Sequence, residues 1–389
     1  MEYAKRMELF GESVFTVMKN RRTAVESRGM EVIDLSIGAP NIPPAPHITK
    51  VLSEEALKPE NYLYAIVDQP ELLDAVIDWY KNRYDVELSR EQITSVLGSQ
   101  EGLSHIGLSL INEGDVVLLP EPCYPVFRDG AALAGAEIHY MPLLEENDYI
   151  IDLKAIPEEL AKKAKLMVVS YPNNPTCALA PDSFYEELIA FAKKYDIVVI
   201  HDNAYSELVY DGNTCGSFLR FPGAMEVGVE FNSLSKTYGL AGARVGFCIG
   251  RQDVVSGLRT LKSNLDFGIF LPVQKAAVAA ITGDQSCVQE VRDAYGARRD
   301  YLVEELGKLG WEIKKPAGTM FVWAKIPASW DSSEEFCIAM LERAGVSITP
   351  GSAFGALGEG YVRFALVRTE EEMQRAFRRI AESGVLNGK

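Results

Sequence analysis

Apolar runs alternate with amphipathic stretches from about residue 93 to about residue 283. Runs such as "ITSVLG", "DVVLLPEP", "LMVVSYP" and "IVVIHD" have the length and composition of β-strands. Between the last two lies "SFYEELIAFAKKY", where helical spacing is kept by Phe184, Leu188, Phe191 and Tyr195. Strands that are apolar throughout are buried on both faces, so the pattern predicts a mainly parallel sheet covered by helices.

A different pattern follows the break at "TGDQS". Residues 288–310 predict one long helix with an apolar stripe formed by Val288, Val291, Tyr295, Leu302, Leu306 and Leu309. Strand-like "TMFVWAKI" and "YVRFALV" then flank a helix around "EEFCIAMLERAG", without the rhythm of parallel crossovers, which predicts a smaller α+β domain. We place a large domain at residues 46–285, and an N-terminal arm with the small domain at residues 1–45 and 286–389.

Composition and charge narrow the class of protein. The 389 residues are 47% hydrophobic and 24% charged, as in an ordinary globular protein. The net charge of −16 argues against a nucleic-acid partner, since phosphate binding needs a surplus of Lys and Arg. The apolar runs are far shorter than the ~18 residues of a membrane span, and the first residues lack the apolar core of a signal peptide. We expect a soluble, cytoplasmic protein without membrane contact.

Six cysteines lie far apart in the sequence, with no close pair of the kind that zinc sites use. We interpret them as reduced thiols and predict no metal site. They are Cys123, Cys177, Cys215, Cys248, Cys287 and Cys337.

Polar side chains follow five of the apolar runs, at the point where each run ends. Ligands of open parallel sheets bind at the carboxyl ends of the strands. One polar residue after a strand is typical of a loop, but five such ends facing one crevice predict a binding site. The side chains are Ser99, Gln100, Tyr124, Asn173, Asn174, Asp202, Tyr205, Ser233, Ser235 and Lys236.

The chemistry of this set fits one coenzyme. Ser99 and Gln100 open a helix, whose first backbone N–H groups can hold a phosphate. Ser233 and Ser235 add hydroxyls, and Arg244 adds a bidentate phosphate partner. A carboxylate for a ring nitrogen, a tyrosine and an asparagine for a phenolic oxygen, and a lysine for an imine complete a site for pyridoxal 5′-phosphate (PLP).

The segment "SLSKTYGLAGARVG" resembles the lysine signature of the class I and II aminotransferases, which are fold type I PLP enzymes. The resemblance continues in "LSIGAPNIP", "GSQEGL", "PCYPVF", "YPNNPT", "HDNAYSEL", "TPGSAFG" and "YVRFAL". Each motif alone is weak, whereas seven in order are highly specific. The chain looks most similar to the branch that holds LL-diaminopimelate and alanine aminotransferases. The resemblance implies an α/β fold whose large domain has a seven-stranded, mainly parallel sheet between helices.

The resemblance also implies roles at the coenzyme. Lys236 would form the internal aldimine and then act as general base and acid. Asp202 would pair with the protonated pyridine nitrogen and keep the ring an electron sink. Tyr205 and Asn174 would hydrogen-bond the phenolic oxygen, and Tyr124 would stack on the ring. The phosphate would be held by Ser99, Gln100, Ser233, Ser235 and Arg244.

Three further residues are implied for the substrate and the neighbouring subunit. Arg363, inside an apolar run, would take the α-carboxylate in a bidentate pair, and Gly38 would let the backbone approach that group closely. Tyr64 resembles the tyrosine that reaches the phosphate of the neighbouring subunit, although Tyr62 is close by and the usual following glycine is absent. A shared tyrosine implies a homodimer with shared active sites.

One position departs from the family. Glycine is common after "NNPT", where this chain has Cys177. A cysteine at positive φ would carry strain. We therefore expect a loop that differs modestly from that of the family.

These observations predict an aminotransferase that moves the α-amino group of an amino acid to 2-oxoglutarate or pyruvate by a ping-pong mechanism. Residues such as Phe15 and Ile37 would make the entrance apolar, and resemblance assigns no arginine to a second carboxylate. The donors to try first are alanine, aspartate and LL-diaminopimelate, whose zwitterionic far end suits neutral hydrogen-bonding groups.

Two alternatives stay open at this point. The same residues support a C–S β-lyase of the cystathionine type, which would release pyruvate without an acceptor. A PLP-sensing regulator would carry a DNA-binding helix-turn-helix ahead of the family pattern, but here that pattern begins within the first 40 residues and the charge opposes DNA binding.

Overall fold

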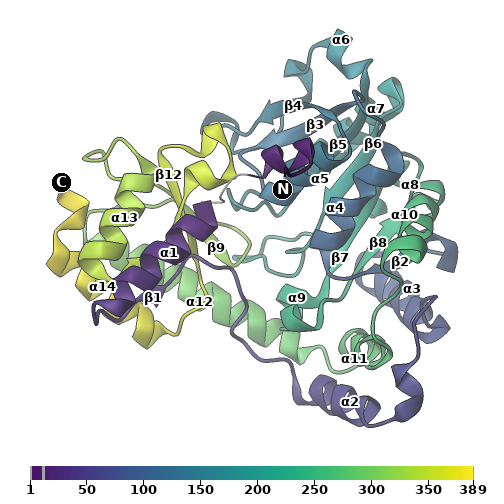
Figure 1. Ribbon diagram of the computed structural model, residues 1–389, viewed down its shortest axis with the longest axis horizontal. Coiled ribbons are helices and arrows are strands. Elements are labelled where there is room, and N and C mark those ends of the chain that lie inside the picture. The colour runs from purple at the N-terminus through teal and green to yellow at the C-terminus, as the bar shows by residue number, and fades with distance from the viewer. Residues whose placement is uncertain (1, 11–13, 389) are drawn as a thin grey trace.

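The computed structural model describes residues 2–10 and 14–388, and its largest element is a seven-stranded sheet. The spatial order is β2-β8-β7-β6-β5-β3-β4 (Figure 1). β8 is antiparallel to both β2 and β7, and the other neighbours are parallel, so the prediction of a mainly parallel sheet is confirmed. The strands are β2 Ile93–Val96, β3 Val116–Glu121, β4 Glu137–Pro142, β5 Ala164–Ser170, β6 Val198–Asp202, β7 Gly228–Ser233 and β8 Gly246–Gly250.

Both faces of this sheet are buried under helices. Leu118 and Met167 face one apolar cluster, whereas their neighbours Val117 and Val168 face the other, as the two-residue period of a strand requires. The first cluster is closed by α2 Pro46–Ala56, α3 Pro70–Tyr84, α7 Asp182–Tyr195 and α11 Leu271–Thr282. The second is closed by α4 Ser99–Leu110, α5 Pro125–Leu133 and α10 Gln252–Leu265. Shorter helices in the same region are α6 Glu158–Ala161, α8 Ala224–Val227 and α9 Leu234–Thr237.

The predicted stripe on α7 is right in part. Phe184 and Leu188 are buried, but Phe191 and Tyr195 are only half-buried. Tyr185, Ile189 and Ala192 complete the buried face instead, because the helix turns a neighbouring side toward the sheet.

A second unit carries its own sheet and core (Figure 1). β9 Phe321–Lys325, β11 Thr349–Pro350 and β12 Tyr361–Ala365 form an antiparallel sheet in the order β11-β12-β9. The predicted long helix is confirmed as α12 Ser286–Lys308, which buries Val288, Val291, Tyr295, Leu302 and Leu306. The remaining helices are α13 Ser333–Ala344 and α14 Glu370–Ser383.

The N-terminal arm joins this second unit. α1 Val14–Ser27 contacts α13, and β1 Ile33–Asp34 pairs in parallel with β10 Val346–Ser347. Gly38, which follows β1, lies at the edge of the large sheet, where its carbonyl accepts from Nζ of Lys236. Across residues 2–10 and 14–388, we find no helix with the length and apolarity to cross a membrane.

Loops at the carboxyl ends of β5 and β6 connect the two units. Cys177, Ala204 and Tyr205 belong to the apolar cluster of the second unit, although they follow strands of the large sheet. Polar residues at this edge of the large sheet are therefore enclosed by β9 and β12. The division of the chain at residues 45/46 and 285/286 stays a prediction.

Candidate active site

One cavity of about 330 Å³ lies where the carboxyl ends of the large sheet meet β9 and β12. All of the predicted coenzyme and substrate residues except Tyr64 line it, whereas the Asn173 side chain, also predicted at a strand end, bonds Ser170 and Thr176 and does not line it. The lining is Ile37, Gly38, Ala39, Ser99, Gln100, Tyr124, Asn174, Asp202, Ala204, Tyr205, Ser233, Ser235, Lys236, Ala241, Arg244, Phe321 and Arg363. The sequence therefore predicted which residues come together, while their roles are a separate question.

One end of the cavity has the groups that an anion requires. Gly98, at φ +75°, turns the chain from β2 into α4, and a Cβ there would lie 2.4 Å from Nη2 of Arg244. Only glycine fits at this place. Arg244 donates through Nη1 to the carbonyl of Ala241 at 3.0 Å and through Nη2 to that of Leu97 at 3.1 Å. A guanidinium beside a helix N-terminus suits a phosphate.

The hydroxyls of β7 and α9 lie at this same end. Ser233 ends β7 and pairs with Gly246 in the sheet. A Cβ on Gly246 would lie 3.2 Å from the backbone nitrogen of Ser99, so the end of β7 and the start of α4 are close neighbours. The Ser233 hydroxyl caps α9 by accepting from the Ser235 N–H at 3.2 Å. Ser235 is thereby fixed at the cavity wall.

Lys236 lies on α9 with its ammonium inside the cavity. Nζ donates to the carbonyl of Gly38 at 2.6 Å. Burial, and then the nearby cations of Arg363 and Arg244, lowers the pKa of Lys236 to about 8. A large share of this amine is therefore neutral near pH 8, as a nucleophile or general base requires.

Asp202 ends β6 as a buried carboxylate. Burial raises the pKa of Asp202 to about 6, opposed by the His201 and Lys236 charges. Its Oδ1 has no hydrogen-bond partner among the described residues. A buried oxygen of this kind predicts a ligand that carries a donor or a positive charge.

Arg363 comes from β12 and is 4% exposed. Nη1 donates to Oδ1 of Asn174 at 2.7 Å and Nη2 to the carbonyl of Ser36 at 3.0 Å. Within the described ranges its Nε has no hydrogen-bond partner, and burial lowers the pKa of the guanidinium to about 10. Both partners are neutral, so the arrangement favours an anionic ligand.

Phe321 on β9 is a cavity residue that the sequence reasoning missed. Its ring lies 4.1 Å from the Arg363 guanidinium carbon, and the Phe354 ring lies 4.7 Å away on the same cation. A Cβ on Gly38 would lie 2.6 Å from the Phe321 ring, which explains the glycine there. An aromatic residue in an apolar strand looks like core, so no sequence signal separated Phe321 from its neighbours.

Two tyrosines line the walls of the cavity. Tyr124 donates through its hydroxyl to Oε1 of Gln100 at 3.0 Å, which holds its ring beside the start of α4. Tyr205 is buried, and its ring meets the edge of Phe321 at 5.7 Å between centroids. Burial raises the pKa of Tyr205 well above its ordinary value, so it stays a hydrogen-bond donor.

Cys177 stands at a position of positive φ, and a modest difference between its loop and that of the family stays a prediction. Cys177 keeps a left-handed backbone, at φ +63°, where glycine carries no penalty. The thiol is buried, donates to the carbonyls of Pro175 and Phe321 and accepts from the Thr319 hydroxyl at 3.2 Å. These contacts offset the strain, and burial raises the pKa of the thiol to about 12, which argues against a reactive cysteine.

Tyr64 and Phe15 complete the account of the predicted residues. Tyr64 lies outside the cavity, 83% exposed, with its ring 5.7 Å from that of Phe267. The Phe15 side chain lies outside the described part of the structure, whereas Ile37 does line the cavity mouth.

Comparisons with known proteins show what the whole chain is similar to. The family described as aminotransferase class I and II matches residues 30–380. An LL-diaminopimelate aminotransferase of Moorella thermoacetica is 44% identical over 384 residues, covering 98% of both chains. The glutamate-pyruvate aminotransferase AlaC of Escherichia coli is 40% identical, covering 96% of this chain and 92% of its own. Substrate-bound BacF of Bacillus subtilis superposes with a TM-score of 0.94 at 34% identity, covering 98% of both chains.

Proposed function

Because this chain belongs to the class I and II aminotransferases, a PLP-dependent family, it is an aminotransferase, and we propose that its cavity binds PLP together with an α-amino acid. The observation that carries the proposal is the position of the Lys236 amine in one cavity with Asp202 and Arg363. The relatives that match over nearly the whole chain are aminotransferases, so the C–S lyase is not favoured.

The residues present fit the coenzyme. The unpartnered Oδ1 of Asp202 suits a protonated ring nitrogen, and the start of α4 with Arg244 suits the phosphate. Ser99, Gln100, Ser233 and Ser235 line the wall at the phosphate end. The phenolic oxygen would meet Asn174 and Tyr205, and Tyr124 would cover a face of the ring.

Bound PLP supplies an electron sink for the electrons left when the Cα proton departs. The Asp202 carboxylate keeps the proton on the ring nitrogen. Lys236 takes the Cα proton on Nζ and returns it, which its lowered pKa favours. Arg363 holds the α-carboxylate, with Asn174 fixing the guanidinium.

The donor is proposed from what the cavity offers beyond the α-carboxylate. In the lining formed by described residues, Arg363 and Arg244 are the guanidiniums, and both already have roles. A distal carboxylate, whether of aspartate or of 2-oxoglutarate, would have to bind groups other than these two guanidiniums, so we keep alanine, aspartate and LL-diaminopimelate as the donors to try first. Relatives named for LL-diaminopimelate and for glutamate and pyruvate support this set, with 2-oxoglutarate or pyruvate as the acceptor.

We further propose a homodimer with shared active sites. Leu63, Tyr64, Ile66 and Val67 are each more than 60% exposed, and a run of apolar side chains in water is typical of an interface. The Tyr62 hydroxyl donates to the carbonyl of Ala56 at 2.8 Å. Tyr64 is therefore the better candidate to reach a phosphate in the second subunit.

We also propose a division into two domains and a cytoplasmic location. The division into a large domain, residues 46–285, and a small domain with the N-terminal arm is supported by separate apolar cores. A cytoplasmic location is supported by cysteines that are all free.

A donor and acceptor panel tests the function. Alanine, LL-diaminopimelate, aspartate and cystathionine are each incubated with and without 2-oxoglutarate or pyruvate, and the 2-oxo acid formed is measured. We expect product only when an acceptor is present. Pyruvate released from cystathionine without acceptor, and no transamination by any donor, would overturn the proposal.

A further inference from the structure

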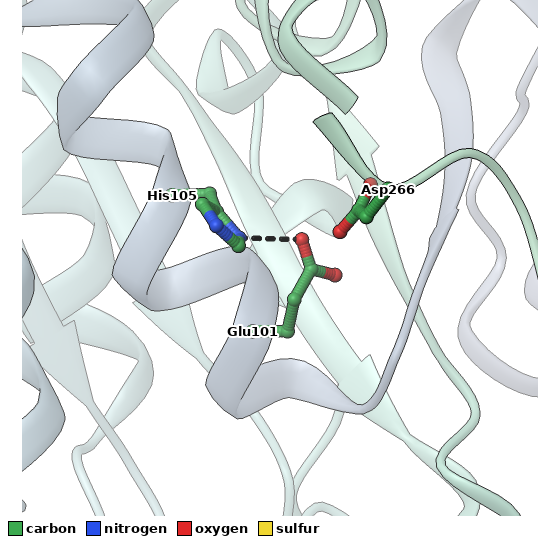
Figure 2. A group of neighbouring side chains, drawn as sticks. All are labelled: Glu101, His105 and Asp266. Carbon is green, nitrogen blue, oxygen red and sulfur yellow. Dashed lines mark hydrogen bonds and ion pairs between the residues drawn. The ribbon is translucent and has the colours of Figure 1, made fainter. Parts of the chain in front are cut away.

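A cluster of ionisable side chains begins on α4, directly after the cavity residues Ser99 and Gln100, and Figure 2 shows three of its members. Glu101 and His105 project from one side of α4, and Asp266 follows the end of α10. Nδ1 of His105 lies 2.7 Å from Oε1 of Glu101. Lys262 completes the cluster, with Nζ 3.0 Å from Oε2 of Glu101 and 3.2 Å from Oδ1 of Asp266.

The three ligand-type residues have the spacing of a metal site, but a cation is already present. Lys262 is 5% exposed and its ammonium lies against both carboxylates. A metal ion would have to displace this ammonium and leave it buried without a counter-charge, which is strongly unfavourable. The cluster is therefore better explained by the hydrogen bond that Glu101 accepts from the backbone of Leu97.

Glu101 fixes the loop that leads into α4. It is the third residue of the helix, and its Oε2 accepts the backbone N–H of Leu97 at 2.9 Å. A capping box would reach the N-cap residue Gly98, but here the carboxylate reaches one residue further back. The carbonyl of Leu97 in turn accepts from Nη2 of Arg244 at 3.1 Å.

One short segment is thus held from both sides. The carboxylate of Glu101 fixes its N–H, Arg244 binds its carbonyl, and Gly98 packs directly on the guanidinium. A shift of this segment would move both the start of α4 and the Arg244 side chain. These are the groups to which the proposed function assigns the coenzyme phosphate.

We propose that Glu101, with its charge balanced by Lys262 and with a hydrogen bond to His105, is a positioning residue that sets the phosphate site through the Leu97 peptide and Arg244. This inference rests on the proposed function. It assigns Glu101 no contact with substrate or coenzyme. The expected consequence is that loss of the Glu101 carboxylate weakens binding of the phosphate group and leaves the rest of the coenzyme site intact.

The test compares two probes, PLP and pyridoxal, which lacks the phosphate. Dissociation constants for the coenzyme-free protein are measured by absorbance titration for the wild type, Glu101→Gln and Lys262→Gln. The matched control is Asp266→Asn, which contacts Lys262 but not the Leu97 segment. We expect Glu101→Gln to weaken PLP binding about tenfold, as the loss of a charged hydrogen bond predicts, and pyridoxal binding less than twofold. Lys262→Gln should weaken PLP binding by a smaller factor, and Asp266→Asn should leave both constants unchanged.

Four other outcomes of these titrations would each contradict a part of the account. Equal weakening of both probes in Glu101→Gln would mean a general loss of structure and not a phosphate-site role. Unchanged PLP binding in Glu101→Gln and Lys262→Gln would end the inference while leaving the proposed function intact. A wild type that binds no PLP would end the proposed function itself. Binding of Zn²⁺ or Mg²⁺ that Glu101→Gln abolishes, with PLP affinity unchanged, would show a metal site instead.

Discussion

Arg363 shows how much a single residue of this site depends on its surroundings. The guanidinium is buried against two phenyl rings and hydrogen-bonded to Asn174 and Ser36, which holds it in place. A lysine cannot reproduce the bidentate geometry. We expect Arg363→Lys to raise KM for the amino donor by about 10- to 100-fold, the value of a charged hydrogen bond, with a smaller change in kcat.

The control is Arg375→Gln, a half-buried arginine that pairs with Glu31 and does not line the cavity. Steady-state kinetics of both variants with one donor and one acceptor give the comparison. An unchanged KM in Arg363→Lys would show that the α-carboxylate binds elsewhere.

Asp202 links the site to the pH dependence of stability. Burial raises its folded-state pKa from 3.8 to about 6. Between these values the folded protein holds a proton that the unfolded chain has released, so the free energy of unfolding falls as pH rises and the loss is complete above pH 6. In coenzyme-free protein, Asp202→Asn should therefore be more stable than the wild type by about 1–3 kcal/mol at pH 8.

Urea unfolding at pH 8 and pH 4.5 checks this prediction. The difference between the two proteins should shrink at pH 4.5, where the wild-type carboxyl is protonated when folded. Bound PLP should reverse the order at pH 8, since the ring nitrogen supplies the missing counter-charge. A difference independent of pH would contradict the burial of an ionised Asp202.

Contacts between elements determine the width of the cavity. The segment after β1 meets β9 where Gly38 lies against the ring of Phe321, and the Gly38 carbonyl accepts from Lys236. A methyl at Gly38 would stand 2.6 Å from that ring, so the segment or the ring has to move. We expect Gly38→Ala to lower kcat/KM at least tenfold, at a cost of about 1–3 kcal/mol for overpacking.

A double-mutant cycle separates this clash from other causes. Phe321→Leu alone weakens the stacking on Arg363, but in combination with Gly38→Ala it should recover part of the lost kcat/KM. Effects of the two substitutions that simply add would show that the ring and the glycine are not in contact.

At the scale of the elements, the sequence predicted those helices and strands whose buried residues recur at a regular spacing. The apolar runs of the large sheet and the stripe of α12 were predictable because both repeat over many residues. Phe191 on α7 was misplaced because a helix with apolar residues on several sides does not reveal which side faces the sheet. Phe321 and Cys177 depended on side-chain packing between β9 and a distant loop, and local pattern carries no record of such contacts.

At the scale of the whole molecule, the site is assembled from both units of one chain and, we propose, from a second chain. Tyr64 is 83% exposed and does not line the cavity of its own subunit. In a homodimer it would meet the phosphate of the other subunit. We expect Tyr64→Phe to weaken PLP affinity about fivefold, as the loss of one hydrogen bond predicts, without changing the mass of the dimer in light scattering.

Tyr62→Phe is the matched control, because that hydroxyl is already bound to the carbonyl of Ala56. It should leave PLP affinity unchanged. A monomeric wild-type protein at micromolar concentration, or equal losses from the two substitutions, would contradict the shared site. Resemblance predicted a tyrosine here, but only the hydrogen bond of Tyr62 separates the two candidates.

The most direct test of the central claim is the chemistry of Lys236. Protein reconstituted with PLP is treated with borohydride, digested and analysed by mass spectrometry. We predict loss of the visible absorbance and one pyridoxyl phosphate group fixed to the peptide that holds Lys236, with Lys236→Ala unlabelled and inactive yet still binding PLP. Labelling of a different lysine, or no PLP absorbance in the wild type at any coenzyme concentration, would contradict the account.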